Sequence, residues 1–85
     1  MYYVYVLRNE LSGKIYIGQT NDLEKRLARH NGYLPAKVRS YTRINKGIWR
    51  VAYKEAFGNR QDSMRREKYL KSHVGRDWIR NKLVR

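Results

Sequence analysis

The chain has 85 residues, a formal net charge of +13 at pH 7 and no cysteine. This length predicts one domain, residues 1–85, with a thin core, and the absence of cysteine excludes disulfide scaffolds, thiolate zinc sites and cysteine nucleophiles. We find no secretory leader and no apolar stretch of about 18 residues, so we expect a cytoplasmic, nucleoid-associated protein. The charge favours a polyanionic partner, and nucleic acid fits better than a membrane surface because no segment is typical of an amphipathic membrane helix.

The first 20 residues predict a β-hairpin. Residues 2–8 and 14–19 alternate β-branched and aromatic side chains, and the residues between them have the composition of a turn. A four-residue loop closed by Arg8 and Gly13 would place Tyr5 opposite Tyr16 on the same face of the sheet.

A short helix is expected next. Residues 20–22 can cap its N-terminus, and the Asn-Gly pair at 31–32 ends it. At 100° per residue, Arg26 and His30 lie side by side and border the apolar stripe that contains Leu27. The helix therefore presents two basic side chains at the edge of the core.

The rest of the chain predicts one more strand and two more helices. We expect a loop or short irregular helix over residues 32–47, a strand over 48–56 and a helix that begins at Asn59 or Asp62. Gly75 should interrupt this helix, and residues 77–84 should form a short closing helix. Three apolar residues of the longer helix are expected to face the sheet: Met64, Leu70 and Val74.

Glu67 lies on the same helical projection as those three residues, so its carboxylate should face the sheet. An unpaired buried charge is costly, and Glu67 therefore needs a cation, either a nearby arginine or a metal ion.

Five polar side chains are therefore expected to converge on one side of the sheet: Tyr5, Tyr16, Arg26, His30 and Glu67. Each alone has a structural explanation, because strands favour tyrosine and a helix edge accommodates arginine or histidine. Together they suit phosphodiester chemistry, which needs a base for water, a fixed cation for the developing charge and a metal ion for the leaving oxygen.

With these residues in view, the chain resembles the GIY-YIG endonuclease superfamily, in particular its short stand-alone bacterial members. Tyr3-Val4-Tyr5 stands at the first half-motif, and Tyr16-Ile17-Gly18 is the second half-motif unchanged. Arg26 follows Tyr16 by ten residues and His30 follows by four more, as on the first helix of the superfamily. The segment RREKYLK, residues 65–71, is similar to the stretch with the family's metal-binding glutamate.

The resemblance implies an α+β fold: a small three-stranded antiparallel β-sheet flanked by helices, in the order β-β-α-loop-β-α-α. It also implies an endonuclease with a single divalent metal, Mg²⁺ or Mn²⁺, held by Glu67. Tyr16 or Tyr5 would help to activate the water, Arg26 would stabilise the phosphorane-like charge, and His30 would assist proton transfer or bind phosphate. A free tyrosine has a pKa of about 10, so a tyrosine base needs help from a neighbouring cation.

Two positions depart from the family pattern, and a third has a counterpart in larger members. Tyr3 replaces the opening glycine, and Gln19 stands where repair-type members carry a lysine, for which Lys14 or Lys37 could substitute. Larger members also carry an asparagine downstream of the glutamate, and Asn81 is its candidate counterpart here.

Homing and repair enzymes of the superfamily choose targets through a second domain, which we do not expect in this chain. Binding should then depend on phosphate contacts and be weakly sequence-selective. We therefore expect selectivity for branched, nicked or single-stranded DNA in repair or recombination, or guidance by another protein, and not recognition of a base sequence. RNA is an alternative substrate. We expect a monomer. The candidate phosphate contacts are Lys14, Arg29, Lys37, Arg39, Arg43, Arg65 and Lys71.

Two functional hypotheses follow. The first is a metal-dependent DNA endonuclease domain. The alternative is a non-catalytic nucleic-acid-binding module that retains the nuclease scaffold, since the charge of +13 explains binding without any chemistry.

Overall fold

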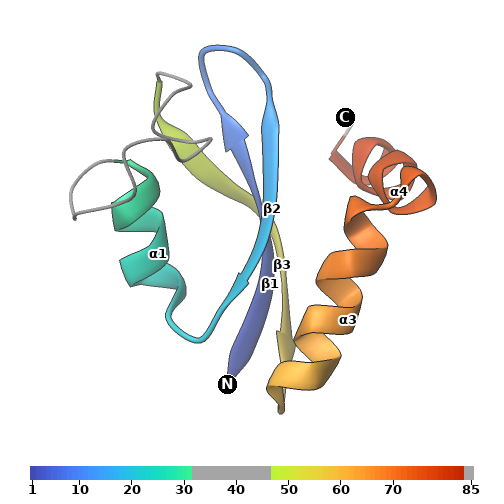
Figure 1. The fold of residues 1–85 in the computed structure, drawn as a ribbon. Helices are drawn as coiled ribbons and strands as arrows, with labels where there is room; N and C mark the ends of the chain where they lie inside the picture. Colours follow the sequence, from blue (N-terminus) through green and yellow to red (C-terminus); the bar gives the residue numbers. More distant parts are fainter. Residues whose placement is uncertain (32–46, 84–85) are drawn as a thin grey trace.

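A three-stranded antiparallel sheet forms the centre of the computed structural model, which describes residues 1–31 and 47–83 (Figure 1). The strands are β1 (Tyr2–Asn9), β2 (Ile15–Thr20) and β3 (Trp49–Phe57), and their order in the sheet is β2-β1-β3. The predicted α+β class and three-stranded antiparallel sheet are therefore confirmed.

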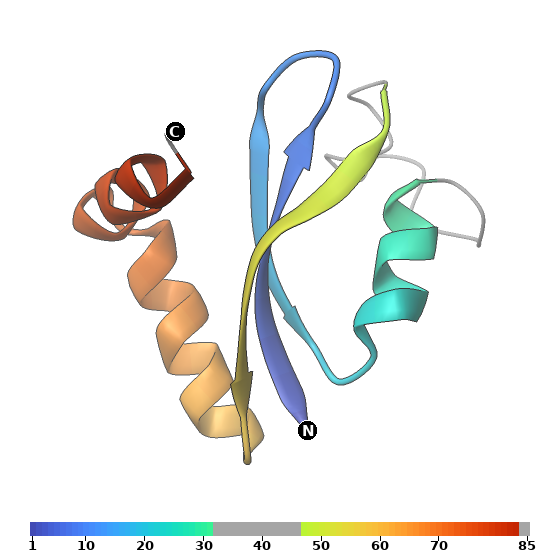
Figure 2. The same ribbon diagram turned by 180° about the vertical axis from the view of Figure 1, so that it is seen from behind.

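Helices cover both faces of this sheet. Helix α1 (Leu23–His30) lies on one face, and helices α3 (Arg60–Lys71) and α4 (His73–Leu83) lie on the other, as the two opposite views show (Figures 1 and 2). We call these the α1 face and the α3–α4 face. The loop predicted over residues 32–47 lies almost wholly outside the described residues. Within residues 1–31 and 47–83, no helix is long and apolar enough to cross a membrane.

Alternation along the strands divides the core into two clusters. The cluster on the α3–α4 face is built from Val4, Val6, Ile17, Leu70 and Ile79. The cluster on the α1 face is built from Tyr5, Leu7 and Trp49. Because β1 is central and covered on both faces, four successive side chains, residues 4–7, are completely buried.

The hairpin register differs from the predicted one by two residues. Arg8 pairs with Ile15, so Tyr5 lies opposite Gly18 and not opposite Tyr16. A shift of two residues preserves the face, because side chains alternate with a period of two. Tyr5 and Tyr16 are therefore diagonal neighbours on the α1 face.

Buried Asn9 explains the shifted turn. Its side-chain oxygen accepts hydrogen bonds from the backbone N–H groups of Leu11 and Ser12, at 2.9 and 3.0 Å. Gly13 then adopts a φ of 77°, and its N–H donates to the Asn9 carbonyl at 2.8 Å. Since the Asn9 N–H donates to the Lys14 carbonyl at 2.8 Å, the loop still has four residues, 10–13, but it lies one position later than predicted.

The break between the two C-terminal helices comes earlier than predicted. Asn59 caps α3, as one of the two expected starts, but the helix ends at Lys71, and Gly75 lies inside α4. The Ser72 hydroxyl accepts the Gly75 N–H at 3.2 Å and so caps the new helix. Gly75 is buried against the preceding helix end, where a Cβ would lie 2.0 Å from the Tyr69 carbonyl oxygen.

Replacing Gly75 by alanine should therefore destabilise the protein by about 2–4 kcal/mol, because backbone atoms cannot yield to the new methyl group as a flexible side chain can. Urea unfolding followed by circular dichroism measures the effect. Gly58→Ala is the matched control, since a Cβ at Gly58 meets nothing within 4 Å. Equal unfolding midpoints for the two variants would contradict the close contact.

Two of the three residues expected to face the sheet do not do so. Met64 is 49% exposed and Val74 is 62% exposed, whereas Leu70 is completely buried. Ser63 occupies the buried position one turn before Glu67. Val74 belongs to α4, which starts in a new direction after Ser72, so one continuous helical projection does not apply to it.

Candidate active site

Gly18 makes room for the phenol of Tyr5. Tyr5 is completely buried, and a Cβ added at Gly18 would lie 2.6 Å from its Oη. A glycine inside a strand marks close approach of another group, and here that group is a side chain from the neighbouring strand. This packing gives the glycine of the second half-motif a physical role.

Both ends of α1 are fixed by side-chain hydrogen bonds. The carboxylate of Asp22 accepts the Lys25 N–H at 3.1 Å, which caps the N-terminus as predicted. At the other end, the amide of Asn31 accepts the Trp49 N–H at 2.8 Å and donates to the Trp49 carbonyl at 3.0 Å. The sequence predicts Asn31 only as a helix end, and no pattern in the sequence signals this bridge to β3.

Helix α1 brings two basic side chains to the buried phenol. Arg26 Nε donates to Tyr5 Oη at 3.3 Å, and Tyr5 Oη lies 3.1 Å from His30 Nε2. Because Arg26 is already a donor, the phenol proton is available to His30. The rings of Tyr16 and His30 pack with centroids 4.7 Å apart. Four of the predicted site residues, from β1, β2 and α1, therefore form one cluster, which we call the Tyr5 cluster.

Burial sets the protonation states in this cluster. It raises the pKa of Tyr5 to about 12, against the opposing hydrogen bond from Arg26. It also lowers the pKa of His30 to about 4, and the positive charge of Arg26 acts in the same direction. The hydrogen bond to Tyr5 raises the pKa of Arg26 further. At pH 7, Tyr5 is a neutral donor, His30 a neutral acceptor and Arg26 a fixed positive charge.

The lowered pKa of His30 predicts a loss of stability in mild acid. The unfolded chain protonates His30 below about pH 6.5, whereas the folded chain does so only near pH 4, so stability falls as the pH drops through this window. With allowance for partial exposure, the loss between pH 7 and pH 5 should be about 1–2 kcal/mol. Urea titrations of wild type and His30→Asn measure it. A wild-type slope no steeper than that of His30→Asn would contradict the buried neutral imidazole.

Glu67 belongs to the helix on the opposite face, so the expectation that all five residues converge on one side of the sheet is wrong. The side chain of Glu67 is 23% exposed and forms an ion pair with Lys71 Nζ at 2.8 Å. Its charge nevertheless contributes to the raised pKa of Tyr5. Helix α3 runs along β2, where the Ser63 hydroxyl oxygen lies 3.4 Å from Gln19 Oε1 and donates to the Arg60 carbonyl at 2.7 Å.

The cation that satisfies Glu67 is therefore a lysine one turn away and not an arginine. Arg66 instead pairs with Glu55, with Nε 2.9 Å from Oε1. Among residues 1–31 and 47–83, no three histidine or acidic side chains cluster as metal ligands. One carboxylate still suits Mg²⁺, which keeps several waters and is often bound by one or two carboxylates together with substrate phosphates. Glu67 can supply such a ligand.

The predicted phosphate contacts lie in different surroundings. Lys14 and Arg65 are exposed, and Arg65 pairs with Asp62 at 3.4 Å. Arg29 is half-buried on α1, and Asn81 is exposed on α4. Three of the predicted contacts lie outside the described residues: Lys37, Arg39 and Arg43.

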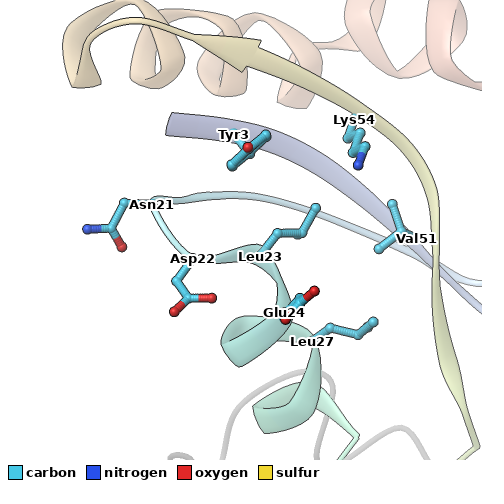
Figure 3. A pocket seen from close by; sticks show the side chains of 8 residues that line it. All are labelled: Tyr3, Asn21, Asp22, Leu23, Glu24, Leu27, Val51 and Lys54. Carbon is cyan, nitrogen blue, oxygen red and sulfur yellow. The ribbon is translucent and has the colours of Figure 1, made fainter. Parts of the chain in front are cut away.

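A hollow of about 430 Å³ lies between α1 and the sheet (Figure 3). Leu23, Leu27 and Val51 form its apolar part. Two carboxylates, Asp22 and Glu24, and one ammonium group, that of Lys54, also line it, and none of the Tyr5 cluster does. Since its charge is net negative, this hollow suits a phosphate poorly, and the Tyr5 cluster is the candidate active site.

Comparison with known proteins places this chain in a family. Residues 1–82 match the GIY-YIG catalytic domain, and the chain therefore belongs to the GIY-YIG family, a family of nucleases. It is 41% identical over 71 residues to the UPF0213 protein CPE1444 of Clostridium perfringens, a match that covers 84% of this chain and 71% of that one. It is 37% identical over 81 residues to a UPF0213 protein of Bacillus pumilus, covering 95% and 72%.

A solved structure has the same fold. The solution NMR structure of the UPF0213 protein BH0048 from Bacillus halodurans superposes with a TM-score of 0.54 at 27% identity, and the match covers 95% of this chain and 84% of that one. The resemblance to short bacterial GIY-YIG proteins is thus confirmed.

Proposed function

We propose that the protein is a metal-dependent DNA endonuclease that hydrolyses phosphodiester bonds with low sequence specificity and selects substrates by their structure, in DNA repair or recombination. The observation that carries this proposal is the hydrogen-bonded Tyr5 cluster. It gathers a cation, a proton acceptor and two phenols in a chain of a nuclease family with a net charge of +13. These groups match the needs of phosphodiester hydrolysis.

Arg26 supplies the fixed positive charge. Its bond to Tyr5 orients the guanidinium group before substrate arrives, and a preorganised cation is most effective where negative charge develops in the transition state. In this role Tyr5 is a positioning residue, because its hydroxyl contacts both Arg26 and His30.

Tyr16 is the better of the two candidates for activating the water. Tyr5 is completely buried with a pKa of about 12, which suits a donor and not a base at pH 7. Tyr16 is only half-buried and packs on His30. Neutral His30 packs on the Tyr16 ring and lies 3.1 Å from Tyr5 Oη through Nε2, so it orients both phenols at pH 7.

Glu67 would hold the divalent ion, Mg²⁺ or Mn²⁺, which when bound would neutralise charge on the leaving oxygen. Lys71 must release the carboxylate for this, and its side chain is 47% exposed and lies on the helix surface, where it can turn into solvent. Substrate phosphate and water would complete the coordination.

A cleavage assay tests the proposal. End-labelled linear, nicked, single-stranded and branched DNA and an RNA of matching sequence are incubated with the protein in Mg²⁺, Mn²⁺ or EDTA. We expect cleavage of DNA only with a divalent ion, restored when metal is added back, with ends that a ligase can rejoin because they carry 5′-phosphate and 3′-hydroxyl groups. Absence of cleavage on every substrate would contradict the proposal.

One observation favours the alternative, a nucleic-acid-binding module without catalysis. Lys71 already satisfies the Glu67 carboxylate, so the protein is electrostatically complete at this position without a metal. Both functions predict binding that weakens steeply with salt, so affinity does not separate them. Metal-dependent turnover in the same assay does.

A further inference from the structure

Two arginines stand directly opposite each other in the sheet. Arg8 of β1 pairs with Arg50 of β3, and both lie on the α3–α4 face, because Val6 and Ile15 next to Arg8 belong to that side. Like charges at directly opposite positions of a sheet repel. Glu10 forms an ion pair with Arg50, whereas within the described part of the chain no carboxylate pairs with Arg8. The pair therefore keeps an excess positive charge.

Two adjoining hollows open beside this pair. One, of about 340 Å³, is lined by both arginines, and the other, of about 270 Å³, is lined by Arg8 and by Lys82 of α4. They share Ala52, the residue skipped where the pairing of β1 with β3 shifts register. The Lys82 ammonium lies 5.6 Å from the ring centre of Trp78 and 6.0 Å from that of Tyr53, and Lys82 lines the second hollow.

The charge of these hollows selects an anion. Three cations from β1, β3 and α4 face one carboxylate there, that of Glu10, in contrast to the hollow beside α1, which carries two carboxylates and one ammonium group. Guanidinium groups bind phosphate with two parallel hydrogen bonds, and adjoining hollows that share Arg8 can follow a chain of successive phosphates.

We propose that Arg8, Arg50 and Lys82 bind the phosphate backbone of a second segment of the nucleic-acid substrate, an inference that rests on the proposed function. The Tyr5 cluster lies on the α1 face and these hollows lie on the α3–α4 face. The helices that define these two faces pack on opposite sides of the sheet (Figures 1 and 2). We expect a straight duplex that contacts the Tyr5 cluster and Glu67 not to reach these hollows as well, because Glu67 lies on α3 beside β2 and Arg50 lies on β3, the opposite edge strand. A branched DNA presents one arm to each face, and branched DNA is therefore the substrate class that the two sites fit together.

Binding measurements on Arg8→Gln/Lys82→Gln test this. Glutamine keeps part of each aliphatic stem, and Arg50 stays because of its ion pair with Glu10. Fluorescence anisotropy in EDTA compares a three-way junction with a linear duplex of equal length across a range of salt. We expect junction affinity to fall about tenfold and the slope of log Kd against log salt to fall by about two, with less than about a twofold change for the duplex.

Matched variants make the result specific. Lys25→Gln/Arg60→Gln removes the same charge from exposed positions outside both hollows, and Arg8→Lys/Lys82→Arg keeps the charge; both should bind the junction nearly as wild type does. If the double glutamine variant melts early, Arg8→Gln alone should lower the slope by about one. If the double glutamine variant lost affinity equally for junction and duplex, or lost none, this inference would be overturned and the proposed function would stand. Failure of the wild-type protein to bind any DNA would overturn the proposed function with it.

Discussion

Replacing Glu67 by alanine should lower the rate of DNA cleavage in Mg²⁺ by about a thousandfold while DNA affinity stays within a few-fold of wild type. The carboxylate would hold the ion that neutralises the leaving oxygen, so its loss removes an interaction made in the transition state and little ground-state binding. Single-turnover cleavage with enzyme in excess measures the rate, and anisotropy in EDTA measures the affinity. Isothermal titration calorimetry should detect Mn²⁺ binding to the free wild-type protein and no binding to Glu67→Ala.

Glu24→Ala is the control for this variant. It removes the same charge from an exposed position on α1, and its cleavage rate should match that of wild type. Cleavage by Glu67→Ala at the wild-type rate would show that Glu67 does not hold a metal ion needed for cleavage. Loss of Mn²⁺ binding without loss of cleavage would separate the metal site from the chemistry.

Replacing Arg26 by alanine should reduce cleavage by about a hundredfold to a thousandfold, the usual effect of losing one preorganised group that stabilises transition-state charge. Arg26→Lys should be intermediate, because lysine keeps the charge but lacks the planar fork and the Nε bond that orients it on Tyr5. The same single-turnover assay gives both rates.

Folding must be checked for the Arg26 variants, since their Tyr5 hydroxyl loses a partner inside the core. A thermal melt establishes this, and Lys25→Ala, on the exposed side of the same helix, serves as the control for a lost charge. Wild-type cleavage by a folded Arg26→Ala protein would exclude Arg26 from transition-state stabilisation.

Much of the fold could be predicted because its signals are local. Alternation gave the hairpin, the third strand and the face shared by Tyr5 and Tyr16, and cap residues gave the ends of α1. The hairpin register could not be predicted, because it depends on whether the Asn9 side chain captures two backbone N–H groups of its own turn. The break between the helices at Ser72 could not be predicted either. Gly75 is the stronger helix-breaking signal in the sequence, and the cap that Ser72 forms with the Gly75 N–H depends on the folded structure.

The candidate site was likewise predictable where its geometry is local and unpredictable where it depends on tertiary packing. Helical spacing places Arg26 and His30 together, and the strand alternation places both tyrosines under them, so the Tyr5 cluster followed from short-range geometry. Glu67 could be assigned to an inward-facing helix surface but not to a face of the sheet, because the packing of α3 depends on contacts with residues far away in the chain. The Lys71 ammonium also competes with a metal ion for the Glu67 carboxylate, and the sequence does not show which of the two cations binds there.

The bridge between Asn31 and Trp49 has a consequence for behaviour at high concentration. Strand β3 is an edge strand, and free backbone groups on an edge can pair with another chain and begin aggregation. The Asn31 amide occupies both backbone groups of Trp49, where β3 begins, and the irregular register at Ala52 interrupts the strand again further along. The side chain that fixes the end of α1 therefore also blocks the pairing of another chain at the start of β3.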